Sequence, residues 1–194
     1  MIRRFILLAL LTLGTWAGAA QAAPAGAALP TDSVYRTALA LRDQTGHPFA
    51  LTSLRGHPVI VSMIYASCGQ ACPITVESIK GIRDAVSART GHDAPPVVLI
   101  SFDPAHDTVD ALAMMASMHH VQSPAWRLAR PDHGDVRGFA ATLGVSYRKR
   151  PDGDFDHNVE IVLLDAEGRI VAKTSEIGTP DPAFVDQVSR AGTN

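Results

Sequence analysis

The stretch Ile64-Tyr-Ala-Ser-Cys-Gly-Gln-Ala-Cys-Pro-Ile-Thr-Val-Glu77 contains the only two cysteines of this 194-residue chain, Cys68 and Cys72. The cysteines follow the apolar run 58–65, whose β-branched residues are typical of a strand that is covered on both faces of a sheet. Pro73 suits a first helical position, and apolar residues then recur at helical spacing. The sequence therefore predicts a strand, a cysteine loop and a helix, in that order.

The two cysteines allow more than one chemistry. Cys72 would lie beside the exposed N–H groups that begin the predicted helix, whose partial positive charge favours a thiolate over a thiol. A thiolate is both a nucleophile and a soft metal ligand. Three intervening residues permit either a disulfide or two sulfurs on one metal ion, so the spacing leaves both open. A purely structural disulfide is a further alternative, although so short a loop would contribute only about 2 kcal/mol or less.

The beginning of the chain has the pattern of a secretory signal. Arg3 and Arg4 precede the apolar run 5–13, and Ala20-Gln-Ala22 supplies the small residues that a signal peptidase accepts. We expect residues 1–22 to be a cleaved signal peptide and the protein to be periplasmic, without stable membrane insertion. An uncleaved membrane anchor is the alternative. Residues 23–30 would be a flexible leader to one domain, 31–194.

Charge and compartment limit the function. The chain has 17 Lys and Arg against 19 Asp and Glu, a net charge of −2, and cleavage would remove two arginines. Nucleic acid is therefore not an expected partner. In an oxidising compartment two neighbouring thiols form a disulfide unless they are reduced or bound to a metal.

Strands and helices alternate along the remaining chain. Counting them gives the order of a thioredoxin-type domain with insertions, an α/β fold with a central mixed sheet flanked by helices and an N-terminal β-hairpin. After the cysteine helix, which is expected to end at Thr90-Gly91, a polar loop is expected at 148–156. The expected strands are 35–41 and 48–51 (the hairpin), 96–102, 126–128, and 159–164 with 169–173 (a second hairpin), and the expected helices are 109–120, 132–143 and 182–191.

The loop after the strand 96–102 should lie beside the cysteine loop, because a right-handed crossover puts the carboxyl ends of both strands at one edge of the sheet. Asp103 and Asp107 could therefore tune the site. The favoured alternative gives them turn and cap roles only, with Asp107 as the N-cap of the following helix. Asp132 is the expected cap of the helix after that.

Methionines and histidines raise the question of further metal sites. Met114, Met115 and Met118 fall at helical spacing, which we interpret as core packing rather than as copper binding. His119 and His120 are consecutive, so they point about 100° apart and cannot hold one ion jointly unless the helix has ended. The histidines in the remaining predicted turns are expected to be solvated (His47, His57, His92, His106 and His133).

His157 is the exception among the histidines. In a thioredoxin-type topology the loop that enters the strand 159–164 lies against the active-site loop, and His157 is in that loop. The topology therefore predicts a functional imidazole beside the two thiols.

The chain resembles the SCO1/SenC family of thioredoxin-like copper-binding proteins over nearly its whole mature length. Four motifs in order carry the resemblance: Leu51-Thr-Ser-Leu-Arg-Gly56, Cys68-Gly-Gln-Ala-Cys72-Pro73, Ser101-Phe-Asp-Pro-Ala-His-Asp-Thr108, and Asp156-His157 followed by 159–168. The resemblance implies copper ligation by Cys68, Cys72 and His157. It also implies copper delivery to, or thiol maintenance of, the CuA site of cytochrome c oxidase.

The resemblance further implies the partners, which would be the CuA subunit of cytochrome c oxidase or another copper chaperone, and we expect a monomer. The sequence departs from the family where Gly69 replaces the usual proline after the first cysteine, so the loop should be looser. Two thiolates and an imidazole suit Cu(I), or Cu(II) with a further weak ligand. Zinc would need a fourth strong ligand, for which Asp103 is the nearest candidate.

A second function uses the same residues, since Cys68 and Cys72 could act as a redox pair in a periplasmic thiol–disulfide oxidoreductase. The protein would then be an enzyme rather than chiefly a metallochaperone. A conventional thioredoxin fits less well, because it has two residues between its cysteines and a proline where His157-Asn158 stands. A peroxiredoxin is disfavoured because the residues before Cys68 lack the threonine and arginine that its reactive cysteine needs.

Overall fold

The computed structural model describes residues 28–67 and 71–192, with side chains in the second segment from residue 73 onward. Cys68, Gly69 and the expected signal peptide 1–22 lie outside the described residues. Of the expected leader 23–30, only residues 28–30 are described, and Leu29 packs against the hydrophobic core. Along the described segments, no helix is both long and apolar enough to cross a membrane.

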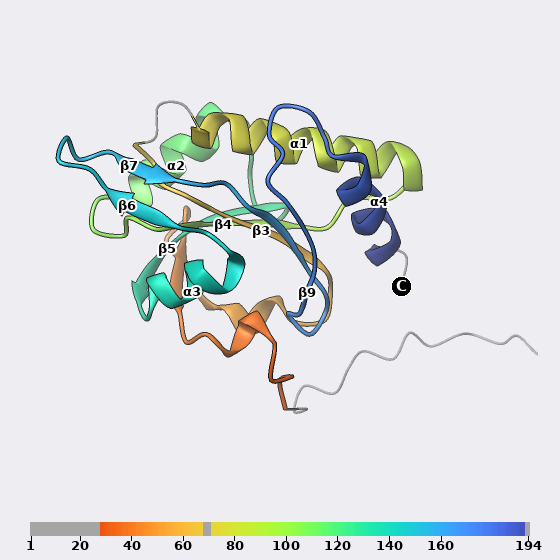
Figure 1. Cartoon of the computed structure of the whole chain (residues 1–194), viewed down its shortest axis with the longest axis horizontal. Coiled ribbons are helices and arrows are strands. Elements are labelled where there is room, and N and C mark those ends of the chain that lie inside the picture. The colour runs from red at the N-terminus through yellow and green to blue at the C-terminus, as the bar shows by residue number, and fades with distance from the viewer. Residues whose placement is uncertain (1–27, 68–70, 193–194) are drawn as a thin grey trace, which may run out of the picture.

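A seven-stranded mixed sheet forms the centre of the domain (Figure 1). β3 and β4 are parallel, as are β4 and β5, whereas the strands at both edges pair in antiparallel fashion. This confirms the expected α/β fold with a mixed sheet and an N-terminal hairpin. The spatial order is β2 (Pro48–Ala50), β1 (Ala40–Asp43), β5 (Trp126–His133), β4 (Val97–Ser101), β3 (Val59–Ile64), β8 (Ile161–Leu164) and β9 (Ile170–Thr174).

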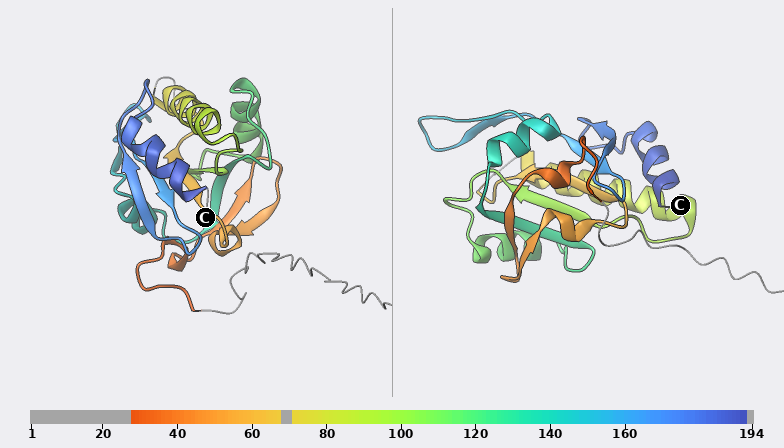
Figure 2. Two further views of the ribbon diagram at one scale, coloured as in Figure 1. Left: turned by 90° about the vertical axis from the view of Figure 1, so that its right-hand side faces the viewer. Right: turned by 90° about the horizontal axis from the view of Figure 1, so that it is seen from below.

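Helices cover both faces of this sheet. α1 (Ala71–Thr90) lies on one face with α4 (Pro182–Ala191) packed against it, and α2 (Val109–Met118) lies beside α1 (Figures 1 and 2). α3 (Val136–Leu143) lies on the opposite face. The closing helix has the predicted bounds, and Asp181 caps it by accepting a hydrogen bond from the Ala183 N–H.

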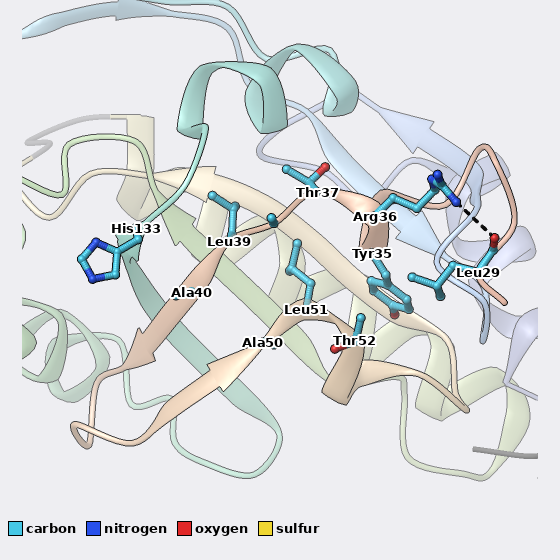
Figure 3. Close-up of a pocket in the computed structure, with 11 residues that line it drawn as sticks. Leu29, Tyr35, Arg36, Thr37, Leu39, Ala40, Ala50, Leu51, Thr52 and His133 are labelled. Atoms are coloured by element: carbon cyan, nitrogen blue, oxygen red, sulfur yellow. Dashed lines mark hydrogen bonds between the residues drawn. The ribbon is translucent and has the colours of Figure 1, made fainter. Parts of the chain in front are cut away.

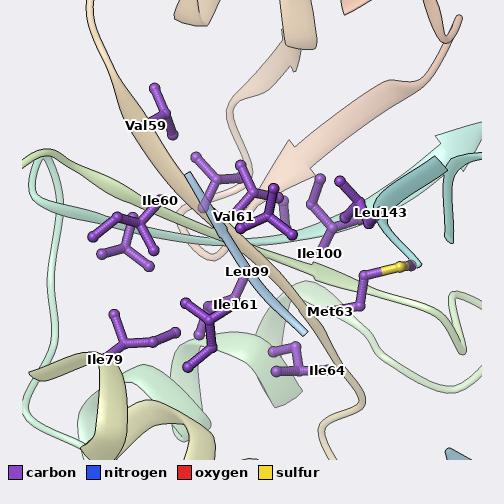
Figure 4. Close-up of a cluster of buried hydrophobic side chains, with 14 of the residues drawn as sticks. Val59, Ile60, Val61, Met63, Ile64, Ile79, Leu99, Ile100, Leu143 and Ile161 are labelled. Carbon is purple, nitrogen blue, oxygen red and sulfur yellow. The ribbon is translucent and has the colours of Figure 1, made fainter. Parts of the chain in front are cut away.

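The central strands are buried on both faces, as their apolar sequences predict. Every residue of β3 and β4 is buried. In Figure 4, Ile79 of α1 lies on one side of β3 and Leu143 of α3 on the other. Because side chains alternate along a strand, Ile60 and Ile64 face α1 while Val61 and Met63 face α3. Because β3 and β4 are parallel, they end at one edge of the sheet, where the cysteine loop begins.

Several predicted boundaries are wrong for local reasons. The first hairpin strand is shorter than 35–41, because Val34–Arg36 form a 3-10 helix (η1) that Ser33 caps through its hydroxyl. A second short 3-10 helix, η2 (Leu51–Leu54), follows β2. α1 already begins at Ala71, so Pro73 is not its first residue.

The predicted cap of α3 is also wrong. β5 is eight residues long rather than three, and it incorporates Asp132, whose carboxylate pairs with Arg42 at 2.8 Å. Asp135 caps α3 instead, by accepting from the Gly138 N–H at 2.8 Å.

The polar segment 148–156 is not a simple loop. Its two ends form a separate two-stranded hairpin, β6 (Tyr147–Lys149) and β7 (Phe155–His157), which extends away from the main sheet (Figure 1). Within it Arg148 pairs with Asp156 at 2.7 Å and Arg150 with Asp154 at 2.7 Å. Strands are recognised in a sequence by alternating apolar residues. In this hairpin oppositely charged side chains pair instead, so the two strands were not predicted.

Candidate metal centre

The backbone places the cysteine segment at the carboxyl edge of the sheet. β3 ends at Ile64, and Cys72 is the second residue of α1, where N–H groups lack partners within the helix. The side chain of Cys72 and the whole of Cys68 are outside the described residues. The described part of the candidate centre consists of the groups around them.

His157 is the last residue of β7 and is half-buried. Its ring packs edge-on against Tyr65, with ring centres 5.7 Å apart, and lies tilted against Phe102, with ring centres 5.2 Å apart. Tyr65 is three residues before Cys68. The topological prediction that His157 lies near the entrance to the cysteine loop is consistent with these contacts.

The hydrogen bonding of His157 leaves one ring nitrogen for a ligand. Nδ1 lies 3.0 Å from the carbonyl oxygen of Asn158, which can only accept, so the contact assigns the ring proton to Nδ1. The lone pair of the neutral imidazole is then on Nε2. This tautomer is the one that a metal ion bound at Nε2 requires.

Tyr65 joins the hairpin to the cysteine segment, a role that sequence reasoning missed. It is almost fully buried, and its hydroxyl donates a hydrogen bond to the carboxylate of Asp154, the residue just before β7. That hydrogen bond, followed by one from the Phe155 N–H, holds the pKa of Asp154 below its usual value of 3.8. A tyrosine directly before a cysteine loop was the available sequence signal, but nothing in the sequence named its partner.

Aromatic rings surround His157. Phe102, which follows β4, stacks on Tyr147 of β6 with ring centres 4.7 Å apart, and Phe155 of β7 contacts Phe102 edge-on at 5.2 Å. Such pairs add about 0.5–1.5 kcal/mol each beyond the area that they bury. The rings, rather than sheet hydrogen bonds, attach the β6–β7 hairpin to the domain.

Asp107 does not cap α2, contrary to the prediction. Thr108 is the N-cap, and its hydroxyl accepts from the Ala111 N–H. Asp107 is instead buried, where it accepts from the Ala66 N–H at 3.0 Å and from the Ser101 hydroxyl. Burial raises the pKa of Asp107, which the hydrogen bond from Ser101 partly offsets. The predicted proximity of this loop to the cysteine loop is confirmed up to Ala66, two residues before Cys68.

Asp103 is largely buried and already has hydrogen-bond partners. Both of its carboxylate oxygens lie within 2.9 Å of His106 Nδ1, and its own N–H donates to the Ser101 hydroxyl. Asp103 would have to separate from His106 before it could act as a fourth ligand for zinc.

The remaining histidines and methionines give a mixed outcome. α2 ends at Met118, so neither His119 nor His120 is part of it. His119 Nδ1 lies 3.3 Å from Glu77 Oε1 on α1.

Met115 is buried as predicted. Met114 and Met118 are 64% and 62% exposed, so the core interpretation is wrong for both. Within residues 28–67 and 71–192, no three His, Cys, Asp or Glu side chains are grouped to hold a metal ion.

A pocket of about 630 Å³ lies elsewhere, between η1, β1 and η2 (Figure 3). Its lining includes Leu29, Tyr35, Leu39, Leu51 and His133, and none of the candidate ligands. This pocket is therefore not the candidate metal centre.

Comparison with known proteins agrees with the fold. The SCO1/SenC family model matches residues 29–191. A SCO1/SenC family lipoprotein from Bacillus anthracis is 21% identical with a TM-score of 0.72, covering 84% of this chain and 96% of that one. ScoI from Bradyrhizobium japonicum, solved with copper bound, is 25% identical with a TM-score of 0.61, covering 77% and 96%.

A third structure is that of BsSco, described as having a disulfide switch and as a member of the Sco family of cytochrome c oxidase assembly proteins. It is 20% identical with a TM-score of 0.69, and the match covers 84% of this chain and 96% of that chain. No curated protein matches the chain by sequence.

Proposed function

This chain belongs to the SCO1/SenC family, and on that premise we propose that it binds copper through Cys68, Cys72 and His157. The observation that carries the proposal is the position of His157. Its ring lies against Tyr65, three residues before Cys68, with Nδ1 bonded to a carbonyl and Nε2 left for a metal ion. The copper-bound ScoI of Bradyrhizobium japonicum, similar along most of its length, supports copper as the metal.

The chemistry of the three groups fits copper. Two thiolates and one imidazole make a soft three-coordinate site for Cu(I), and a weak further ligand or water would complete a site for Cu(II). Zinc prefers four strong ligands, and the nearest candidate, Asp103, is paired with His106. The helix start at Cys72 favours the thiolate that binding requires.

We infer that the bound copper is cargo, delivered in the periplasm to the CuA site of cytochrome c oxidase or exchanged with another copper chaperone. The assignment of BsSco to a family of cytochrome c oxidase assembly proteins supports this role. The signal-like residues 1–22 and the Bacillus anthracis lipoprotein support export.

The second candidate function is thiol–disulfide exchange by Cys68 and Cys72, which the disulfide switch of BsSco supports. In such a reaction a thiolate attacks a disulfide sulfur, forms a mixed disulfide and releases the other sulfur as a thiolate. The second cysteine then resolves the mixed disulfide, so the Cys68–Cys72 pair is oxidised as the partner is reduced.

Replacement of His157 separates the two functions, because an imidazole can bind copper but is not needed for a thiolate to attack a disulfide. In His157→Ala we expect Cu(II) binding to weaken by at least about tenfold, while exchange with a small disulfide survives within about tenfold. Copper titration and a thiol-exchange assay measure the two. His92→Ala is the matched control, because His92 is exposed in the loop after α1, and it should change neither.

Replacement of either cysteine should damage copper binding and disulfide cycling together. If His157→Ala binds both Cu(I) and Cu(II) as tightly as the parent protein, the three-ligand site is wrong. The oxidoreductase function is then the better interpretation.

A further inference from the structure

Two methionines on α2 are exposed to solvent and are not packed in the core. Met114 and Met118 are 64% and 62% exposed, the highest values among the five large apolar side chains that are exposed in the described residues. Most methionines of a folded domain fill gaps in the core, as Met63 and Met115 do here. Met114 and Met118 therefore contribute little to stability and leave two thioether sulfurs accessible to solvent.

The helix places these two sulfurs on one face. At 3.6 residues per turn, Met114 and Met118 are only about 40° apart around the axis, and residues four apart have their Cβ atoms about 5–6 Å from each other. The buried residues of α2 lie on the face toward the sheet (Leu112, Met115 and Ala116). The flexible side chains of Met114 and Met118 can thus converge on one point above the outer face.

The charges of α2 favour a cation at that point. Asp110 lies one turn before Met114 on the same face, and α2 contains no Lys, Arg or His. Beyond its end, His119 is directed to Glu77, and Lys80 is paired with the same carboxylate at 3.1 Å. The Glu77 carboxylate therefore balances the charge of Lys80, and Asp110 can compensate a bound monovalent ion.

From this arrangement we propose that Met114 and Met118 form a surface site for a soft monovalent cation of the Cu(I) type, distinct from the centre at Cys68, Cys72 and His157. Neutral thioethers select soft ions and bind Zn²⁺ or Mg²⁺ poorly. With two protein sulfurs and the remaining coordination open to water or an incoming ligand, the site holds the ion in rapid exchange with solvent. No electron transfer is involved, because the ion keeps its oxidation state.

Silver is the probe for this site, since Ag(I) has the same charge and softness as Cu(I) and is stable in air. The titration uses the full chain with Cys68→Ser and Cys72→Ser, in halide-free buffer, so that the thiols do not compete. NMR of labelled methionine methyl groups should show the signals of Met114 and Met118 shifting together, while those of buried Met63 and Met115 stay in place. Zinc should shift none of them.

The matched variants keep the apolar surface but remove the sulfurs. Met114→Leu with Met118→Leu should weaken silver binding by about tenfold or more, whereas Met115→Leu should leave it unchanged. Retention of full silver affinity in the double leucine variant, or equal shifts of buried and exposed methionines, would overturn the proposal. Because the cysteines are absent from these proteins, the result is independent of whether the three-ligand centre is correct.

Discussion

The two hairpins of the C-terminal half are built on different physical principles. β8 pairs with β3 in the main sheet, and all four of its residues are buried. β6 and β7 pair only with each other, and their residues are half-buried or exposed. The β8–β9 hairpin is part of the core, whereas the β6–β7 hairpin is attached by aromatic contacts and by the buried hydroxyl of Tyr65. His157 is therefore carried by a hairpin that lies outside the main sheet.

The largest effect expected from this comparison is on stability, in β8. Leu163 is fully buried, so Leu163→Ala should lower the free energy of unfolding by about 2–5 kcal/mol through lost burial and a cavity. Denaturant unfolding measures this. Val171→Ala on the exposed side of β9 is the control and should change the value by only about 0.5 kcal/mol. A loss below about 1 kcal/mol in Leu163→Ala would mean that β8 is no more essential than β7.

A smaller effect is expected from cutting the link between Tyr65 and Asp154. Tyr65→Phe keeps the ring but removes the hydroxyl that lowers the pKa of Asp154, so that pKa should rise toward its usual value of 3.8. The Phe155 N–H still donates to the carboxylate and should preserve part of the shift. A carboxyl titration followed by NMR measures the change.

The sign of the accompanying pH dependence follows from the lowered pKa. The stabilisation from Tyr65 is present above the unfolded pKa of an aspartate, about 3.9, and is lost as the pH falls through the lower folded value. Hydrogen exchange in β7 should thus be faster in Tyr65→Phe at neutral pH, and the difference should vanish in acid. Equal exchange at neutral pH would show that the aromatic rings alone hold the hairpin.

The smallest effect is expected on the outer side of the same hairpin. Arg148 and Asp156 are 2.7 Å apart, but their side chains are 82% and 47% exposed. Arg148→Gln should therefore change the free energy of unfolding by less than about 1 kcal/mol, and added salt should reduce even that difference. Unfolding at low and high ionic strength provides the test. A larger, salt-independent loss would indicate that the ion pairs, not the rings, maintain β6–β7.

The sequence by itself determined the central layers of this protein. Short apolar runs that are rich in β-branched residues are typical of strands covered on both faces, so β3 and β4 were predictable from residues 58–65 and 96–102. Helical spacing predicted α1, and the Pro182 start predicted α4. The same reasoning predicted the order of the main-sheet strands and of the helices but missed β6 and β7. It also predicted that the segment of His157 lies near the edge where β3 ends, and there the ring of His157 contacts Tyr65.

Only the tertiary structure decided how polar and exposed groups are used. Asp107 has the sequence position of a helix cap. Its carboxylate is nevertheless buried, where it accepts hydrogen bonds from the Ala66 N–H and the Ser101 hydroxyl. Tyr65 and Asp154 are 89 residues apart, and no periodicity connects them. Met114 and Met115 are adjacent and chemically identical, but α2 turns one toward solvent and the other toward the sheet. The sequence gives the apolar residues and their spacing, but only the packing of the elements decides which of these residues are covered.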